Sequence, residues 1–430
     1  MHRVLRLSKH LQAAKHIGLV TAISLLIACG GSSGPEITST VAPFTVESVA
    51  AATPVSSSTP IDSVPVIQPA TPTTLIPPIT PALPITPPAP TTPTTSATAF
   101  VGVMDGNGKL KIFILAGQSN MVGFGKVDVG ADMTKPNRTP HILGGAGSLR
   151  AMVNNNPTAY SYLVSGTKSV TYTIEGVTKT YPDWVSRDDV WVSSWDSGDI
   201  GKTAELRNGA LTVGFGSEKV LPYGYIGPEF GFGHRVGNGL TDKVLLIKTS
   251  WGGKSLAVDF RPPSSGGTTG PYYTEMLAKV RTVLADVKKY YPAYDGKGFE
   301  IAGLGWHQGW NDRIDDKFVA EYEVNLANLI RDLRKDLGLP AMAVVIGNTG
   351  MANADADPRA VKLITAQGNV ADSKKYPEFA GTVSTVDTRP FHYPLNSPEI
   401  GFSHHWNYNG ESYFRIGESM GNAMMKLLKP

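Results

Sequence analysis

The sequence has a single cysteine, Cys29, among its 430 residues. A disulfide within the chain is therefore excluded, and a zinc site has little to draw on, because only six histidines follow residue 28. Neither sign of charge is in marked excess. Four basic residues and no acidic residue precede Cys29, and without those four the 39 basic residues become 35 against 36 acidic. This balance does not predict nucleic acid or an anionic surface as a partner.

Long apolar runs are also scarce. The run Ile17–Ala28 follows a basic start, is too short to span a bilayer comfortably, and has no second hydrophobic segment after it. Residues 1–28 are therefore predicted to be a secretory signal peptide. The run ends in Leu26-Ile27-Ala28-Cys29, which resembles the lipobox of bacterial lipoproteins. An ordinary signal peptide with a chance cysteine is the alternative.

The lipobox resemblance implies that Cys29 receives a diacylglycerol and becomes the lipidated N-terminus. Two or more acyl chains would hold the protein stably on a membrane. The residue after the cysteine is Gly30 rather than an aspartate, and in this the chain resembles lipoproteins that are sent on to an outer membrane. We therefore expect a lipid-anchored protein of the bacterial cell envelope, periplasmic or surface-exposed, with the membrane as partner through its lipid.

Residues 30–99 lack lysine and arginine and carry 15 of the chain's 32 prolines. Such a segment buries too little apolar surface to fold, and its X-Pro units favour extended conformations. With Cys29 it is predicted to form a disordered, Pro/Thr/Ser-rich stalk over residues 29–99. A Pro-rich docking motif is the alternative, although no aromatic or basic anchors mark one.

Residues 100–430 alternate apolar runs with segments of helical spacing. Leu110–Ala116 is nearly unbroken, with Lys111 as its only polar member, as in a strand buried on both faces. Four further strands are predicted at 244–248, 300–305, 342–347 and 382–387, and helices at 272–291, 317–337 and 411–428. Together they predict a three-layer α/β/α sandwich with a five-stranded parallel sheet. Residues 127–225 lack helical periodicity and are predicted to be an irregular, β-containing insertion, with β-like runs at 169–174 and 190–192.

Conspicuous residues follow three of these strands and precede the last helix. They are Gly117-Gln118-Ser119-Asn120-Met121, Ser250-Trp251-Gly252-Gly253, Trp306-His307-Gln308-Gly309 and Ser403-His404-His405. Carboxyl ends of parallel strands meet at one edge of a sheet, where ligand sites form. A nucleophile, a base and oxyanion donors need this layout. The alternative for Ser119 alone is a helix cap.

This combination of motifs resembles the SGNH hydrolases, and within them the sialate O-acetylesterase-like group, similar to carbohydrate esterase family 6. The resemblance covers about residues 110–425. It implies hydrolysis of acetyl esters on a carbohydrate substrate, with no metal and no cofactor. Ser119 does not lie in a GxSxG elbow, because its context reads Gly117-Gln118-Ser119-Asn120-Met121, so an ordinary α/β-hydrolase is disfavoured.

Carried over by motif, Ser119 matches the nucleophile and His405 the base, with His404 as its neighbour. The backbone N–H groups of Ser119 and of Gly252 or Gly253, with the Gln308 side chain, match the oxyanion donors. A hydroxyl is too weakly acidic to attack unaided, so an imidazole must take its proton. The candidate substrate-binding residues are Gln118, Asn120, Trp306, Asn311 and Arg261, although a structural ion pair is the alternative for Arg261.

Two positions depart from the family pattern. Trp310 follows Gln308-Gly309 where a glutamate is usual, and Phe402 and Ser403 occupy the usual positions of the acid before the histidine. Asp387 is the preferred substitute for that acid, with Glu399 as the alternative and a Ser–His dyad as a third possibility. Asp387 could instead pair with Arg389.

Three functions remain open from the sequence. The first is a serine esterase that removes O-acetyl groups from a polysaccharide or a sialic-acid-like glycan through an acetyl-serine intermediate. The second is a non-catalytic glycan-binding lipoprotein on the same fold, and the third is an esterase for other short acyl esters. The oligomeric state and the glycan are not indicated.

Overall fold

The computed structural model describes residues 105–132, 134–135, 141–195, 200, 206–217, 219–352, 354–392 and 403–429. The predicted signal peptide, Cys29, the predicted stalk and Glu399 lie outside these residues. Among the described residues, no helix is both long and apolar enough to cross a membrane.

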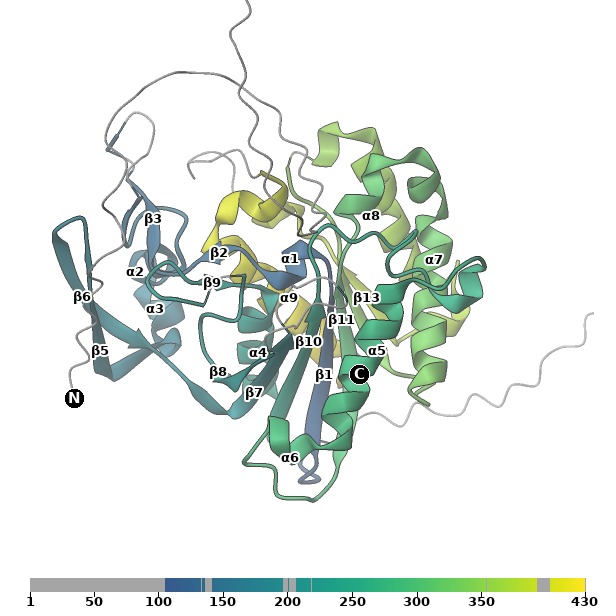
Figure 1. The fold of residues 1–430 in the computed structure, drawn as a ribbon, viewed down its shortest axis with the longest axis horizontal. Coiled ribbons are helices and arrows are strands. Elements are labelled where there is room, and N and C mark those ends of the chain that lie inside the picture. Colours follow the sequence, from purple (N-terminus) through teal and green to yellow (C-terminus); the bar gives the residue numbers. More distant parts are fainter. Residues whose placement is uncertain are drawn as a thin grey trace, which may run out of the picture. The chain divides into compact units, whose positions relative to one another are not determined.

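A seven-stranded sheet forms the centre of the fold, in the order β13-β12-β11-β1-β10-β7-β8 (Figure 1). Its strands are β1 (Leu110–Gly117), β7 (Arg187–Trp195), β8 (Leu206–Leu211), β10 (Val244–Ser250), β11 (Phe299–His307), β12 (Ala343–Gly347) and β13 (Val383–Val386). All neighbouring pairs are parallel except β7 and β8. The five predicted strands are all present. The predicted count of five was wrong, because β7 and β8 of the insertion extend the sheet beyond β10.

The strand β1 explains why the apolar runs predict this sheet. All eight of its residues are buried. Ile112 and Ile114 belong to the core on one face, whereas Phe113 and Leu115 belong to the core on the other. The polar exception, Lys111, is also buried, and its ammonium lies 2.9 Å from Glu300 and 3.2 Å from Asp242. A buried charge is tolerated here because it is paired and hydrogen-bonded.

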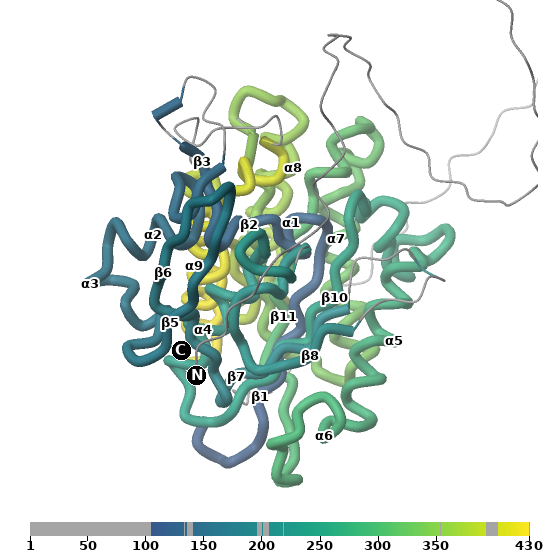
Figure 2. Tube along the Cα trace, turned by 60° about the vertical axis from the view of Figure 1, so that its left-hand side comes forward, coloured from purple at the N-terminus to yellow at the C-terminus, as the bar shows by residue number. Residues whose placement is uncertain are grey.

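Helices cover both faces, which makes the predicted three layers (Figure 2). One face carries α4 (Pro228–Gly239) and α9 (Gly410–Leu428), and the other carries α5 (Pro271–Ala285), α7 (Asp316–Asp336) and α8 (Pro358–Val370). The predicted helix over 272–291 is interrupted, because the Asp286 side chain caps a new short helix, α6 (Val287–Tyr290). Neither α4 nor α8 was predicted.

Helix α4 was missed because it contains four glycines, which favour helices poorly. Its packing against α9 explains them. A Cβ added at Gly231 would lie 2.1 Å from the carbonyl oxygen of Phe414, and one added at Gly417 of α9 would lie 2.0 Å from that of Pro228. The two helices therefore approach more closely than any side chain at these positions would allow.

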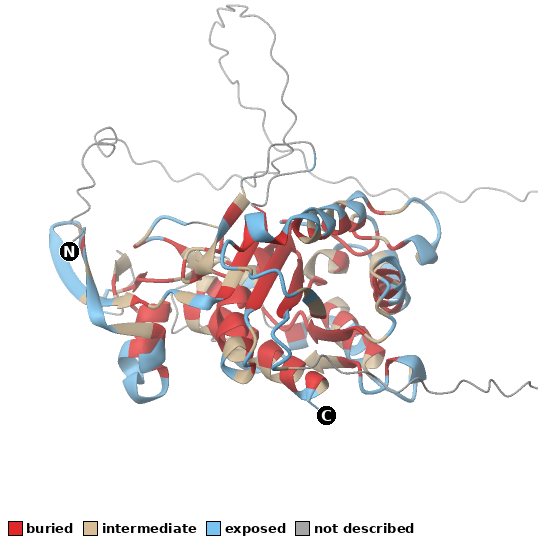
Figure 3. Cartoon of the chain, turned by 90° about the horizontal axis from the view of Figure 1, so that it is seen from below, coloured by how far each residue is buried: buried red, intermediate tan, exposed pale blue. Residues whose placement is uncertain are grey.

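The insertion forms small ribbons and two short helices beside the sheet. Its elements are β2 (Gly125–Lys126), β3 (Val129–Ala131), β4 (His141–Leu143), α2 (Leu149–Asn155), α3 (Pro157–Tyr160), β5 (Val164–Ile174), β6 (Val177–Trp184) and β9 (Tyr225–Ile226), besides β7 and β8. The prediction that it lacks helices was wrong, although the β-like runs lie in β5 and β7. Much of the β5–β6 hairpin is exposed, in contrast to the buried central strands (Figure 3).

Candidate active site

Four loop segments meet at the carboxyl edge of the sheet, as the motifs predicted. Helix α1 (Ser119–Val122) follows β1 directly, at the upper edge in Figure 1. Its turn is tied to the next two strands, because Trp251 N donates to Gly117 O at 3.2 Å and Gln118 N donates to His307 O at 3.3 Å. The fourth segment is tied by Asn120, whose Nδ2 donates to His404 O at 3.1 Å.

The turn at Ser119 depends on the glycine two residues before it. Gly117 has φ +155°, and a Cβ there would lie 2.1 Å from His307 O, so no other residue fits. Ser119 is the first residue of α1 and does not cap it, because Gln118 holds the N-cap position without a side-chain bond. Among the described residues, none forms a hydrogen bond with the Ser119 hydroxyl, whose residue is 6% exposed. The capping alternative is therefore not what the structure shows.

Backbone N–H groups at this edge form a candidate oxyanion site. No described residue accepts a hydrogen bond from the N–H of Ser119, Gly252 or Gly253. Both glycines are exposed, and a Cβ added at either would meet no atom within 4 Å. Gly253 has φ +66°, and its carbonyl accepts a 2.8 Å hydrogen bond from Asn311 Nδ2. The turn thus presents open donors on a backbone that Asn311 holds in place.

The Gln308 side chain is more firmly engaged than the sequence indicated. Its Nε2 donates to Asp312 Oδ2 at 2.6 Å and to Lys254 O at 3.0 Å, and its Oε1 accepts from Tyr322 Oη at 3.1 Å. Both amide hydrogens are thus used within the protein. Gln308 would donate to an oxyanion only by exchanging one of these bonds, and the one to the Lys254 carbonyl is the longer.

Asp312 is a site residue that sequence reasoning missed. It is fully buried, and besides Gln308 it accepts hydrogen bonds from the backbone N–H groups of Leu256 and Ala257, each at 2.9 Å. Burial raises its pKa to about 7, against the opposing effect of these hydrogen bonds. The available signal was an acid four residues after Gln308. Asp312 therefore connects the backbone at Leu256 and Ala257, which follows the Gly252-Gly253 turn, to the Gln308 amide.

His405 lies in the interrupted 3-10 segment η7 (Ser403–Tyr408). Its ring stacks on that of Phe124, with centroids 4.2 Å apart and planes 4° apart. Burial, and secondarily the nearby His404, lowers the pKa of His405 to about 3. The imidazole is therefore neutral at neutral pH.

The backbone after His405 is held in an unusual conformation. Trp406, Asn407 and Tyr408 have φ values of +53°, +52° and +56°. Such conformations persist only where the surroundings enforce them, and they concentrate at functional sites. Here Trp406 is fully buried, and Tyr413 Oη contacts both Asn120 Oδ1 at 2.9 Å and His405 O at 3.4 Å.

The carboxylate of Asp387 is engaged by two neighbouring side chains. Arg389 donates to its two oxygens from Nε at 2.9 Å and Nη2 at 2.8 Å, and Asn348 Nδ2 donates at 3.0 Å. Burial acts to raise the pKa of Asp387, but these hydrogen bonds outweigh it and the pKa is lowered. The pairing with Arg389 is the alternative that the sequence left open.

The candidate substrate-binding residues divide into two groups. Gln118, Asn120 and Asn311 lie at the site, where they tie its loops together. Gln118 Oε1, for example, accepts from Gly309 N at 3.1 Å and from Asn311 N at 3.2 Å. The structure places Trp306 fully inside the core, and His307 beside it is buried with Nδ1 3.0 Å from Gly347 O.

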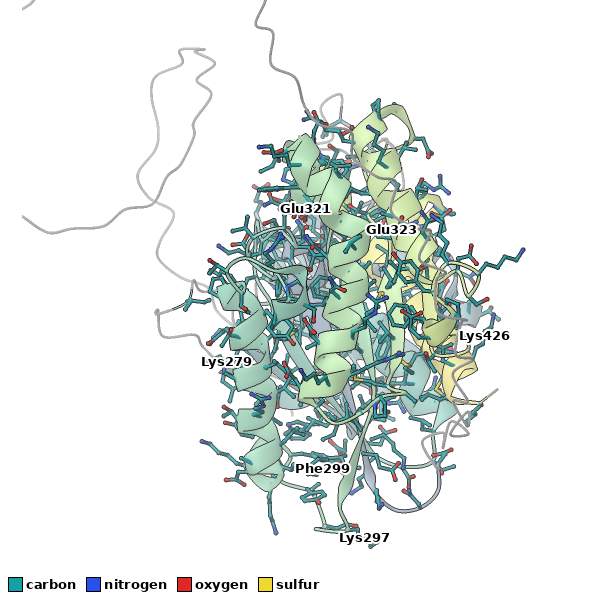
Figure 4. The ribbon with its side chains drawn as sticks, turned by 90° about the vertical axis from the view of Figure 1, so that its right-hand side faces the viewer. Lys279, Lys297, Phe299, Glu321, Glu323 and Lys426 are labelled. Carbon is teal, nitrogen blue, oxygen red and sulfur yellow. The ribbon has the colours of Figure 1, made fainter. Side chains whose placement is uncertain are left out.

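Arg261 forms the ion pair that was its alternative. Its Nη1 lies 2.6 Å from Glu321 on α7, whose position Figure 4 shows, and its other donors bind the carbonyls of Gly266 and Ser265. Within the described residues, no group of three or more His, Cys, Asp or Glu side chains is arranged to hold a metal ion.

Residues 213–426 match a family model described as carbohydrate esterase, sialic acid-specific acetylesterase. A comparison with curated proteins found no significant match.

Solved structures show weak overall likeness. A protein from Arabidopsis thaliana is 18% identical with a TM-score of 0.43, covering 74% of this chain and 98% of its own. A carbohydrate acetylesterase from Xanthomonas citri is 13% identical with a TM-score of 0.41, covering 73% and 55%. NanS is 11% identical with a TM-score of 0.42, covering 75% and 98%. At these TM-scores the likenesses add nothing to the functional argument.

Proposed function

This chain belongs, through residues 213–426, to the sialic acid-specific acetylesterase family of carbohydrate esterases, and we propose that it is a serine esterase that removes O-acetyl groups from a glycan. Ser119 precedes the matched residues, so its role rests on geometry. The observation that carries the proposal is the placement of an unbonded Ser119 hydroxyl at the edge that also holds the open N–H groups of Gly252 and Gly253.

The first half of the reaction forms an acetyl-enzyme. Ser119 Oγ attacks the acetyl carbonyl carbon while the neutral His405 imidazole takes the hydroxyl proton. The carbonyl oxygen becomes an oxyanion, and the N–H groups of Ser119, Gly252 and Gly253 donate to it, each donor being worth about 3 kcal/mol. The tetrahedral intermediate then expels the sugar oxygen, which receives the proton from His405.

The second half regenerates the enzyme. His405 takes a proton from water, the resulting hydroxide attacks the acetyl-serine carbonyl, and the same N–H groups bind the new oxyanion. The Ser119–acetyl bond breaks, and the protonated imidazole returns its proton to Ser119 Oγ. Acetic acid leaves and releases its proton to water as acetate forms, so atoms and charge balance without a cofactor.

A non-catalytic glycan-binding protein is the second candidate. The observation that favours it is the full engagement of both Gln308 amide hydrogens together with the pairing of Asp387 with Arg389. An esterase for other short acyl esters is a variant of the first proposal, since none of the described site residues is assigned a role in limiting the length of the acyl chain.

The decisive experiment is acetate release from a panel of acetylated polysaccharides, acetylated xylan included, and from 4-nitrophenyl esters of increasing chain length. Wild type is compared with Ser119→Ala and, as a matched control, with Ser373→Ala at an exposed serine after α8. We expect only Ser119→Ala to lose activity and only wild type and the control to be labelled by a fluorophosphonate. Absence of all ester hydrolysis by wild type would favour the non-catalytic candidate.

We also propose that Cys29 anchors the protein to a membrane of the bacterial cell envelope by a lipid. The support is the sequence Leu26-Ile27-Ala28-Cys29 after a basic, apolar leader. Mass spectrometry of the mature N-terminus tests this, and Cys29→Ala is expected to release the protein into a soluble fraction.

A further inference from the structure

A pocket of about 190 Å³ lies close to His405 and is formed by the insertion. We name it the tyrosine pocket, and its lining residues are Lys126, Val129, His141, Pro222, Tyr223, Tyr225 and Tyr408. They come from the β2–β9 ribbon, the segment before β9, the β3–β4 ribbon and η7, and β2 lies near α1 in Figure 1. The reaction proposed above does not use this pocket.

Phe124 connects the tyrosine pocket to the proposed base. The Phe124 ring stacks in parallel on the His405 ring, with the ring centroids 4.2 Å apart. The Phe124 ring centroid also lies 5.8 Å from that of Tyr408 and 6.1 Å from that of Tyr225, and these two tyrosines are 5.9 Å apart. The ring centroid of Tyr408 also lies 6.1 Å from that of His405, so the aromatic wall of the pocket reaches the imidazole both directly and through Phe124.

A pocket that adjoins the proposed base suits a sugar next to the one that carries the ester. A sugar seated in the pocket would place its neighbour, across one glycosidic bond, toward His405 and Ser119. Tyrosine rings offer a flat apolar surface and a hydroxyl that can bond to a sugar. Tyr223, 51% exposed, extends this surface at the outer side.

The charge of the pocket restricts the sugar further. Lys126 Nζ lies 3.4 Å from each ring nitrogen of His141 and 5.8 Å from the Tyr408 ring centroid. Burial and then the Lys126 charge lower the pKa of His141, so its imidazole remains neutral at neutral pH. None of the seven lining residues is acidic. A small pocket with a few polar groups among aromatic rings is typical of ligand sites.

We propose that the tyrosine pocket is a second sugar subsite, which binds a carboxylate-bearing sugar adjacent to the acetylated sugar of an oligosaccharide. This inference rests on the proposed esterase function. The tyrosines stack on the sugar ring and Lys126 pairs with its carboxylate. The charged group thus belongs to the neighbouring sugar, and the enzyme favours acidic chains over neutral ones.

The test uses a hexuronate-substituted xylotriose without acetyl groups, so that binding is measured without turnover. Its control is the same oligosaccharide after reduction of the carboxylate to an alcohol. Titration calorimetry on the full chain at low salt is expected to give a Kd at least 10-fold lower for the acid, and this preference should shrink as salt screens the charge.

Variants assign the preference to the pocket. Lys126→Met should bind both oligosaccharides equally, Lys126→Arg should retain much of the preference, and Lys374→Met, at an exposed lysine after α8, should behave as wild type. Tyr223→Ala should weaken both ligands alike. Equal binding of the two ligands by wild type, or a preference that survives in a folded Lys126→Met protein, would overturn the subsite.

Ester hydrolysis separates the two proposals. If 4-nitrophenyl acetate is cleaved in a Ser119-dependent manner but the calorimetry shows no charge preference, the subsite alone is wrong. If wild type prefers the acidic oligosaccharide but cleaves no ester, the binding pocket stands and the esterase function fails.

Discussion

The Nε2 of Gln308 and the Oδ2 of Asp312 lie 2.6 Å apart in a fully buried contact. The same carboxylate holds the backbone at Leu256 and Ala257, which continue the glycine turn. Two of the loops that meet at the candidate site are therefore fixed by one acid. Changes at Asp312 should affect the geometry of the oxyanion site without removing any group that touches the substrate.

Asp312→Asn tests this positioning. Since an amide nitrogen cannot accept a hydrogen bond, at least one of the hydrogen bonds that Asp312 accepts is lost, and we expect kcat to fall about 10-fold or more with a smaller change in KM. Stability should fall by about 1–3 kcal/mol at low pH, the usual cost of an unsatisfied buried group. Steady-state kinetics and urea unfolding measure the two effects, and an unchanged kcat would remove Asp312 from the site.

The raised pKa of Asp312 also predicts a pH dependence of stability. Between pH 4 and about pH 7 the folded state holds a proton that the unfolded state has released. The stabilisation is complete below pH 4 and is lost as the pH rises through about 7. Urea unfolding of wild type from pH 4 to 8 should show this decline, and the decline should be smaller in Asp312→Asn. Parallel curves for the two proteins would contradict the assignment.

The lowered pKa of His405 predicts a wide range of activity on the acid side. Because the pKa is about 3, the imidazole stays unprotonated well below the usual histidine range. We expect the acid limb of the pH profile of kcat/KM for 4-nitrophenyl acetate to have its midpoint below pH 5. The variant Phe124→Leu, which removes the stacked ring, should move that limb upward. A wild-type limb centred near pH 6.5 would show that His405 is solvated in the working enzyme.

The variant Gly253→Ala separates a catalytic effect at the candidate oxyanion site from a simple effect of backbone strain. Gly253 and Gly338 have nearly equal φ values, +66° and +67°, and both have open space where a Cβ would stand. Both alanine variants should lose about 1 kcal/mol of stability, because the left-handed conformation disfavours a side chain. Only Gly253→Ala should lower kcat, since Gly338 follows α7 and is outside the site. Equal kcat values in the two variants would argue against a role for the turn.

Asp387→Asn and Arg389→Met distinguish catalysis from pairing. If Asp387 orients His405, the asparagine variant should lose at least 100-fold in kcat while Arg389→Met keeps most of it. If the ion pair is structural, the two variants should lose similar stability and little activity. Glu399→Gln, measured beside them, shows whether the acid lies there instead, and high activity in both acid variants would indicate a Ser–His dyad.

The central sheet was predictable because its strands are buried on both faces and read as apolar runs. The meeting of three motifs at one edge followed from the parallel strands that they end, whereas the fourth motif precedes the last helix. Strand β7 gave a weaker signal, since Arg187, Asp188 and Asp189 open it, and its place in the sheet depends on pairing with β10. Helix α4 was not predicted because its glycines favour helices poorly, and these glycines are explained only by the close contact with α9.

The details of the site were less accessible from sequence. Asp312 looks like an ordinary polar loop residue until its burial is known, and the engagement of Gln308 depends on that carboxylate. The contact between Phe124 and His405 joins residues far apart in sequence through a stacking geometry that no local pattern encodes. Arg261 had two physical interpretations, and only its neighbouring side chains identify the ion pair with Glu321.

The pairing of β1 has a consequence for the order of folding. Strand β1, which precedes the proposed nucleophile, pairs on one side with β10 and on the other with β11, whose Glu300 is separated from Lys111 by 189 positions. Contacts this distant form slowly, because a long loop must be closed before they stabilise anything. The turn that bears Ser119 is hydrogen-bonded to His307 through Gln118 N, so it cannot reach its final conformation while β11 is unpaired. Esterase activity should therefore return only with the slowest phase of refolding, and a chain interrupted before β11 should have no trace of it.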